Sequence, residues 1–70
     1  MENGHIQIRD LDRQAAVHML AKTDAERVGL SNRAAIRVAN YGATLVARGR
    51  SAASAMLATR AYARRLAGAA

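Results

Sequence analysis

Hydrophobic and polar residues alternate strictly in one short stretch near the N-terminus. Residues 5–9 are His-Ile-Gln-Ile-Arg, and both apolar members, Ile6 and Ile8, are β-branched. Alternation with a period of two is typical of a β-strand, because successive side chains of a strand point to opposite faces. The pattern therefore predicts a short strand whose two isoleucines share one face. The polar side chains of the other face are His5, Gln7 and Arg9.

The next segment has helical spacing. Asp10 and Asp12 are both suited to cap a helix, and residues that suit a core recur after them every three or four positions. This set is Leu11, Ala15, Ala16, Met19, Leu20 and Thr23. Gly29 predicts the end of the helix, since glycine readily adopts the left-handed conformation found just past a helix.

Two further helices are predicted downstream. Ser31 is a typical N-cap and begins a helix that runs toward Arg48. Gly49 ends this helix, and Ser51 begins an alanine-rich helix over residues 51–66. Small residues spaced by four in the second helix predict close helix packing in the core of a dimer: Ala39, Ala43 and Ala47, with Gly42 beside them.

The strand has a structural requirement that a single chain does not meet. A lone strand leaves its backbone donors and acceptors without partners, so we expect it to pair with the same strand of a second copy. The predicted fold class is therefore mainly α with one short N-terminal β-strand, two helices and an extra C-terminal helix, assembled as a homodimer. Residues 1–48 form the predicted dimerisation domain and residues 49–70 a separate alanine- and arginine-rich helix. The expected shared core includes Ile6, Ile8, Leu11, Ile36 and Leu45.

Composition supports oligomerisation. The 70 residues suffice for one small domain, and half of the 51% that is apolar is alanine, so a monomer has few large side chains to bury. The absence of cysteine excludes disulfides and thiolate metal sites. No apolar run approaches the ~18 residues that span a bilayer, so we expect a cytoplasmic protein with no membrane partner.

Charge is divided unevenly along the chain. All five acids lie within the first 26 residues, where three cations leave a local charge of −2. From Arg27 onward there are eight arginines and no acid, a local charge of +8. Such an excess indicates a polyanionic partner, which could be nucleic acid, an acidic protein surface or an anionic membrane.

Two motifs resemble the ribbon-helix-helix family of DNA-binding dimers (Arc/MetJ type). Residues 6–11, Ile-Gln-Ile-Arg-Asp-Leu, are similar to the strand-to-helix signature of its FitA-like and VapB-like antitoxin branch. Residues 29–37, Gly-Leu-Ser-Asn-Arg-Ala-Ala-Ile-Arg, resemble the turn and the start of the second helix in that branch. The resemblance covers roughly residues 4–48 and implies an intertwined ribbon-helix-helix homodimer, able to form larger oligomers on DNA, that represses transcription.

The resemblance also implies how double-stranded DNA is contacted. In that fold the antiparallel ribbon enters the major groove, where Arg9 can bind guanine and Gln7 can bind adenine, each through two hydrogen bonds. His5, near the strand end, completes the predicted base-reading set. The alternative is that these three side chains are the solvated face of an edge strand.

A phosphate contact is predicted at the start of the second helix. The backbone N–H groups of Leu30, Ser31 and Asn32 lie at the positive end of the helix dipole, where a phosphate is favoured. Arg33 would add a salt contact to the same phosphate. The alternative is that Ser31 serves only as an N-cap.

The C-terminal segment resembles, in position only, the tail with which such antitoxins bind a toxin. PIN-domain toxins carry acidic, metal-binding active sites, so the resemblance implies that arginines of this tail pair with those acids. The predicted toxin-binding residues are Met56, Leu57, Arg60, Arg64 and Arg65. The alternative is a helix that packs back on the domain, with its arginines in solvent.

No catalytic or metal-binding pattern is visible in the sequence. His5 and His18 are far apart, and there are no paired carboxylates, Ser-His-acid set or phosphate-binding glycine loop. We expect no enzymatic activity, no cofactor and no metal. The leading hypothesis is a repressor that is the antitoxin of a type II toxin–antitoxin pair, neutralising a PIN-domain toxin. The alternatives are a plasmid or phage accessory DNA-binding protein without a toxin, and a basic helical protein that binds an acidic partner.

Overall fold

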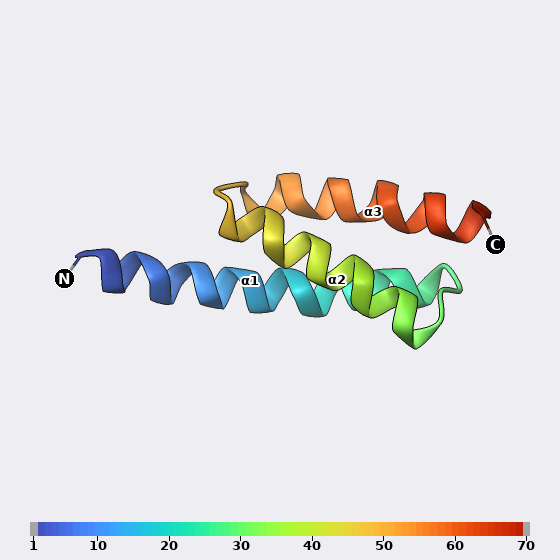
Figure 1. Cartoon of the computed structure of the whole chain (residues 1–70), viewed down its shortest axis with the longest axis horizontal. Helices are drawn as coiled ribbons and strands as arrows, with labels where there is room; N and C mark the ends of the chain where they lie inside the picture. The colour runs from blue at the N-terminus through green and yellow to red at the C-terminus, as the bar shows by residue number, and fades with distance from the viewer. Residues whose placement is uncertain (1, 70) are drawn as a thin grey trace.

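The computed structural model is a bundle of three helices (Figure 1). It describes the backbone of residues 2–69 and the side chains of residues 11–68. Helix α1 spans Glu2–Arg27, α2 spans Asn32–Ala47 and α3 spans Ala52–Ala69. Consecutive helices run antiparallel, so α1 and α3 point the same way, and the first turns of α1 extend beyond the α2–α3 hairpin. None of the described helices has the length and hydropathy that a bilayer span requires.

The first interhelical turn is built by three consecutive residues. Gly29 has a φ of 95°, which lets the chain leave α1 in the left-handed conformation that glycine tolerates best. The N–H of Gly29 donates to the carbonyl of Glu26, and the N–H of Leu30 donates to that of Ala25. This pair of bonds satisfies the last carbonyls of the helix in a Schellman motif. Ser31 then caps α2 by accepting a hydrogen bond from the N–H of Ala34 at 3.2 Å.

The second turn, twenty residues later, has the same combination of a Schellman motif and a serine N-cap. Gly49 has a φ of 102°, and its N–H donates to the carbonyl of Val46. The N–H of Arg50 donates to the carbonyl of Leu45, and Ser51 accepts from the N–H of Ser54 at 3.1 Å. Both predicted turns, with their glycine ends and serine caps, are therefore confirmed. A Gly-x-Ser segment in this chain joins two helices of a plain hairpin, at both of its occurrences.

The predicted N-terminal strand is wrong. The backbone of residues 5–9 lies inside α1, and the described backbone contains no strand, so the chain does not have a ribbon-helix-helix fold. The physical reason is that a helix satisfies these backbone groups within the segment, whereas a strand needs a partner. No proline interrupts the segment, and the alternation of five residues is too short to outweigh its helical continuation. The side chains of Ile6 and Ile8 lie outside the described residues.

The core is made of small residues. Along α1 the buried positions are Val17, Ala21 and Ala25, which are spaced by four and so form one stripe. The other helices contribute mostly alanine and valine to the same core: Ala35, Val38, Ala39, Val46, Ala55 and Ala63. Met56, Tyr62 and Leu66 of α3 pack at its margin, so the C-terminal helix folds back against α1 and α2.

Most of the large side chains predicted for the core point outward. The apolar set proposed for the first helix, Leu11 to Thr23, is exposed, with Leu11 at 61% and Met19 at 66%. Ile36 is also exposed, and Leu45 is half-buried against the Val17 cluster. Tight contact between helices requires small side chains, so the alanine and valine stripe is buried in preference to the leucines and methionines.

The three helices come closest at Gly42. A Cβ atom placed on Gly42 of α2 would lie 2.7 Å from Thr59 Cγ2 of α3 and 2.9 Å from Val17 Cγ1 of α1. Both neighbours are β-branched and only 1% exposed, so neither can move aside at little cost. Thr59 is further held by a hydrogen bond from its hydroxyl to the carbonyl of Met56 at 2.9 Å.

We predict that Gly42→Ala destabilises the protein, although alanine is the better helix former. Forcing a methyl group between Thr59 and Val17 should cost about 1–3 kcal/mol, which corresponds to a fall in Tm of roughly 5–15 °C for a chain of this size. Gly68→Ala is the matched control, because an added Cβ there meets no atom within 4 Å. It should raise Tm slightly through helix propensity. Thermal unfolding followed by circular dichroism measures both, and a Gly42→Ala protein as stable as Gly68→Ala would contradict the packing.

Candidate nucleic-acid interface

The outer face of α2 carries a row of polar and basic side chains. Arg33, Arg37, Tyr41, Thr44 and Arg48 follow one another at spacings of four, four, three and four, which places them on one side of a helix. All five are exposed. With a rise of 1.5 Å per residue, the row extends for about 22 Å.

The core determines where this row points. The opposite side of α2 is buried and consists of Ala35, Val38, Ala39, Gly42 and Val46. Close packing of that small-residue side against α1 and α3 leaves the arginines no position except the outer surface. The N-cap at Ser31 and the glycine at position 49 fix the ends of the helix that displays them.

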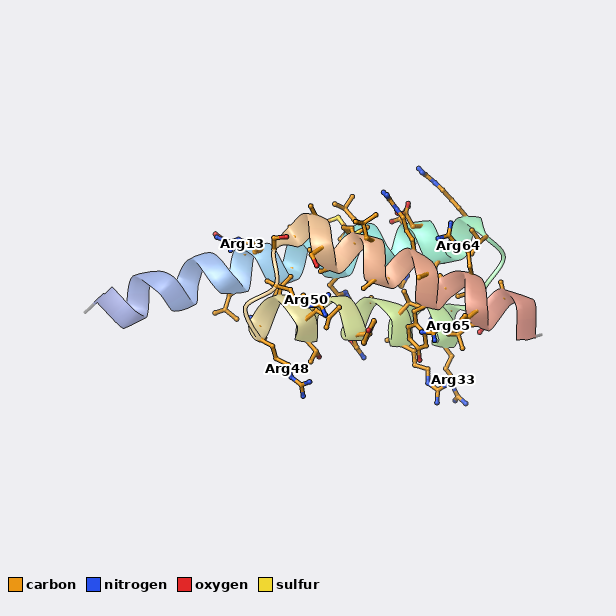
Figure 2. All side chains as sticks on the ribbon, turned by 90° about the horizontal axis from the view of Figure 1, so that it is seen from above. Arg13, Arg33, Arg48, Arg50, Arg64 and Arg65 are labelled. Atoms are coloured by element: carbon orange, nitrogen blue, oxygen red, sulfur yellow. The ribbon has the colours of Figure 1, made fainter. Side chains whose placement is uncertain are left out.

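Two tyrosines connect this row to α3. The rings of Tyr41 and Tyr62 meet edge to face, with centroids 5.1 Å apart and an interplanar angle of 63°. The guanidinium of Arg65 lies 5.9 Å from the centroid of the Tyr62 ring, a cation–π distance. Figure 2 shows Arg33, Arg48 and Arg65 along one edge of the bundle, with Arg13 and Arg64 toward the other. We call Arg33, Arg37, Arg48 and Arg65 the arginine face.

Acidic side chains do not neutralise the arginine face. Within residues 11–68, the ion pairs join Lys22 to Glu26 and Asp24 to both Arg27 and Arg60, all on α1 or between α1 and α3. The chain has no acid after Glu26. The arginine face therefore forms a concentrated positive surface that a polyanion can neutralise.

The predicted phosphate site at the start of α2 is only partly available. The N–H of Leu30 donates to Ala25, and its side chain is half-buried against the core, so Leu30 cannot bind a phosphate as predicted. Ser31 acts as the N-cap. Ser31, Asn32 and Arg33 are exposed at the positive end of α2, and Arg33 belongs to the arginine face.

The strand that was predicted to carry the base-reading residues is absent from the described backbone. The side chains of His5, Gln7 and Arg9 lie outside the described residues, and their backbone is helical. In a strand, alternate residues share a face, whereas in a helix they are about 200° apart in rotation. Residues 5, 7 and 9 therefore do not form one row on α1.

The five residues predicted to bind a toxin do not form one free surface. Met56 packs at the core, whereas Leu57 is 67% exposed. Arg60 pairs with Asp24 of α1 on one side of α3, while Arg65 lies over Tyr62 on the side facing α2. Arg64 lines a pocket with Arg60. The helix packs back on the bundle, as the alternative interpretation of this segment expected.

Sequence reasoning missed Arg37, Tyr41, Arg48 and Tyr62 as members of a common surface. The spacing of Arg33, Arg37 and Tyr41 was a usable signal, because residues four apart are neighbours on a helix. The contact of Tyr41 with Tyr62 depends on how α2 and α3 pack and has no local signal in the chain.

Comparisons with protein-family models, curated proteins and solved structures gave no match. Among the described residues, no group of three histidine, aspartate or glutamate side chains comes together as a metal site would require. The chemistry of the arginines is therefore the basis for assigning a function.

We predict that the free protein becomes more stable as salt concentration rises. Arg33 and Arg37, like Arg60 and Arg64, are like charges four residues apart, and such pairs each destabilise a helix by about 0.2–0.5 kcal/mol. Chloride at 0.2 M should screen them and raise Tm by about 2–5 °C relative to 0.02 M. A double variant with Arg33→Gln and Arg37→Gln should show a smaller rise of Tm with salt. A Tm that falls with salt would show that ion pairs outweigh the repulsion.

Proposed function

We propose that this protein binds nucleic acid, and specifically the phosphate backbone of double-stranded DNA, through its arginine face. One observation carries the proposal: four exposed guanidinium groups share a surface, and none of them has an acidic partner among the described side chains. Guanidinium groups suit this role because their planar forks bind phosphate oxygens through two hydrogen bonds.

Salt dependence follows from the number of arginines. Each phosphate neutralised on duplex DNA releases condensed counterions, so the affinity falls with salt with a slope of about −0.9 per contact on logarithmic axes. Four contacts would give a slope of about −3.6. Contacts to phosphates position a protein and carry no base information, so the proposed binding tolerates many sequences.

A membrane surface is a poorer partner for the same helix. A helix that lies on a bilayer inserts an apolar face beside its cations. The buried side of α2 consists of alanine, glycine and valine packed against α1 and α3, and Ile36 and Tyr41 are the large hydrophobic side chains that α2 exposes, at 38% and 40%. Transcriptional repression and toxin neutralisation stay predictions from the sequence, and the DNA contact proposed for α2 does not depend on them.

The proposal predicts a loss of binding that depends on which arginines are removed. A triple variant that combines Arg33→Gln, Arg37→Gln and Arg48→Gln keeps only Arg65 of the arginine face. Affinity for a 20-base-pair duplex should fall by about 100-fold or more at low salt, since each charge-assisted contact contributes at least about tenfold when well formed. The salt slope should shrink to about −1. Fluorescence anisotropy of labelled duplex at several salt concentrations measures both quantities.

A matched control removes the same charge elsewhere. The control is a triple variant that combines Arg13→Gln, Arg27→Gln and Arg60→Gln and also lowers the net charge by three. These arginines lie on α1 and on the α1 side of α3. The affinity of this control should fall by less than about tenfold, and its slope should stay near that of the unaltered protein. Equal losses in the two triple variants would mean that net charge alone drives binding, and no binding by the unaltered protein would reject the proposal.

A further inference from the structure

A pocket lies between α1 and α3, away from the arginine face. Its volume is about 270 Å³. The buried floor is formed by Ala21 of α1 and by Thr59 and Ala63 of α3, each at most 4% exposed. Val28, just past the end of α1, adds an apolar wall. The inside of the pocket is therefore mostly hydrocarbon.

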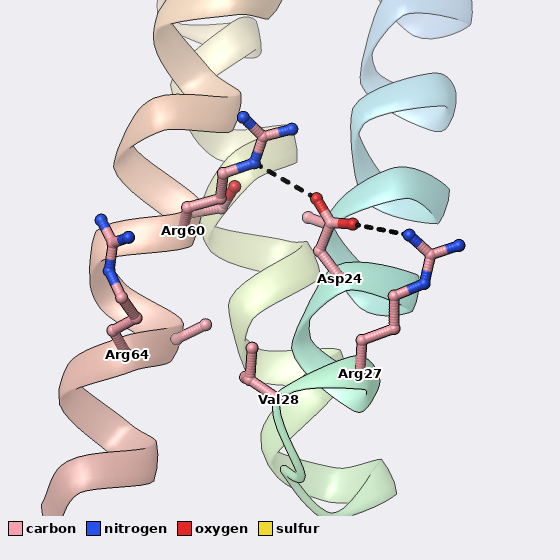
Figure 3. Close-up of a pocket in the computed structure, with 8 residues that line it drawn as sticks. Asp24, Arg27, Val28, Arg60 and Arg64 are labelled. Carbon is pink, nitrogen blue, oxygen red and sulfur yellow. Dashed lines mark hydrogen bonds and ion pairs between the residues drawn. The ribbon is translucent and has the colours of Figure 1, made fainter.

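The rim of the pocket is strongly basic. Arg27, Arg60 and Arg64 line it together with a single acid, Asp24. Figure 3 shows Asp24 between Arg60 and Arg27, with Arg64 one turn further along α3. Asp24 Oδ2 accepts from Arg60 Nε at 3.3 Å, and Oδ1 lies 3.8 Å from Arg27 Nη1. Arg64 has no acidic partner among the described side chains.

Asp24 uses only a small part of the donor capacity of the rim. A guanidinium carries five N–H donors, and the contact with Asp24 occupies the Nε–H of Arg60 and at most one Nη group of Arg27. Asp24 thus lies beside two guanidinium groups of the rim and leaves most of their donors free. Three cations and one carboxylate leave a formal charge of +2, which matches a doubly charged anion.

The size of the pocket restricts the ligand. Ligand sites for drug-sized molecules begin at roughly 300 Å³, and a cavity of about 150 Å³ is enough for one benzene ring. At about 270 Å³, the pocket suits a compact group of about one ring with a charged head at the rim. An apolar floor also favours a ligand with a hydrocarbon part over a bare inorganic ion.

We propose that the pocket between α1 and α3 binds a small phosphate monoester, with the ester group on the Ala21–Thr59–Ala63 floor and the dianionic phosphate held by Arg27, Arg60 and Arg64. The carboxylate of Asp24 competes with the ligand for two of these arginines, Arg27 and Arg60. This site is independent of the arginine face, since it lies on other helix surfaces and needs none of the same side chains.

Calorimetric titration of the full chain with three probes tests the ligand class. Phenyl phosphate supplies both the dianion and the ring, inorganic phosphate supplies only the anion, and benzoate supplies the ring with a single charge. Phenyl phosphate should bind at least about fivefold more tightly than either of the others. Equal affinity for phenyl phosphate and inorganic phosphate, or no measurable binding of phenyl phosphate, would overturn the proposal.

Variants of adjacent residues locate the site. Arg64→Gln should weaken phenyl phosphate binding by about tenfold, the loss expected for one charge-assisted contact, while leaving duplex DNA binding nearly unchanged. Arg65→Gln is the matched control, because Arg65 faces Tyr62 and lies outside the pocket. It should leave phenyl phosphate binding unchanged. Equal weakening by the two variants would reject the pocket in favour of diffuse charge attraction.

Asp24→Asn gives a result of opposite sign. It keeps the shape of the side chain and removes the competing charge, so phenyl phosphate should bind about three- to tenfold more tightly. Circular dichroism melts of each variant verify that the bundle is intact. Weaker binding by a folded Asp24→Asn protein would contradict the charge match on which the ligand class depends.

Discussion

The close approach of three helices at Gly42 is the constraint on which the rest of this structure depends. Thr59 of α3 and Val17 of α1 both reach the surface of α2 where glycine has no side chain, and both are almost completely buried. Helices that come this close can place only alanine, valine and similar small residues between them. The chain has 70 residues, is rich in alanine and is poor in large apolar groups. Its core therefore forms through close contact between helices and not through the burial of large side chains.

This packing has a direct consequence for function. Each helix places its small-residue side in the core, and its longer side chains lie at the margin of the core or on the surface. On α2 these are arginines without acidic neighbours, and tyrosine contacts bring Arg65 of α3 beside them. On the α1–α3 side, a second group of arginines, two of which lie beside Asp24, lines the rim of an apolar pocket. The uneven charge of the sequence thus becomes two separate basic surfaces, one open and one concave.

Local signals in the sequence predicted part of this fold correctly. Gly29, Ser31, Gly49 and Ser51 each act through bonds to residues a few positions away, so the turns and the starts of α2 and α3 could be predicted from composition and spacing. Features that depend on contacts between distant parts of the chain could not be predicted in this way. The alternation at residues 5–9 favoured a strand only if a partner strand existed. The set from Leu11 to Thr23 was predicted for the core, but the side of α1 that faces the other helices carries Val17, Ala21 and Ala25 instead. The recurrence of Gly-x-Ser at residues 49–51 was the available sign that the first such turn also joins two helices of a hairpin.

Nuclear Overhauser spectroscopy on the free protein, filtered to report contacts within one chain, tests this account most directly. Cross-peaks from the α-protons of Gly42 to the methyl groups of both Thr59 and Val17 are expected, together with helical amide–amide contacts through residues 5–9. Absence of the Gly42 cross-peaks, with interchain strand contacts across residues 5–9 in their place, would contradict the three-helix bundle and the arginine surfaces that follow from it.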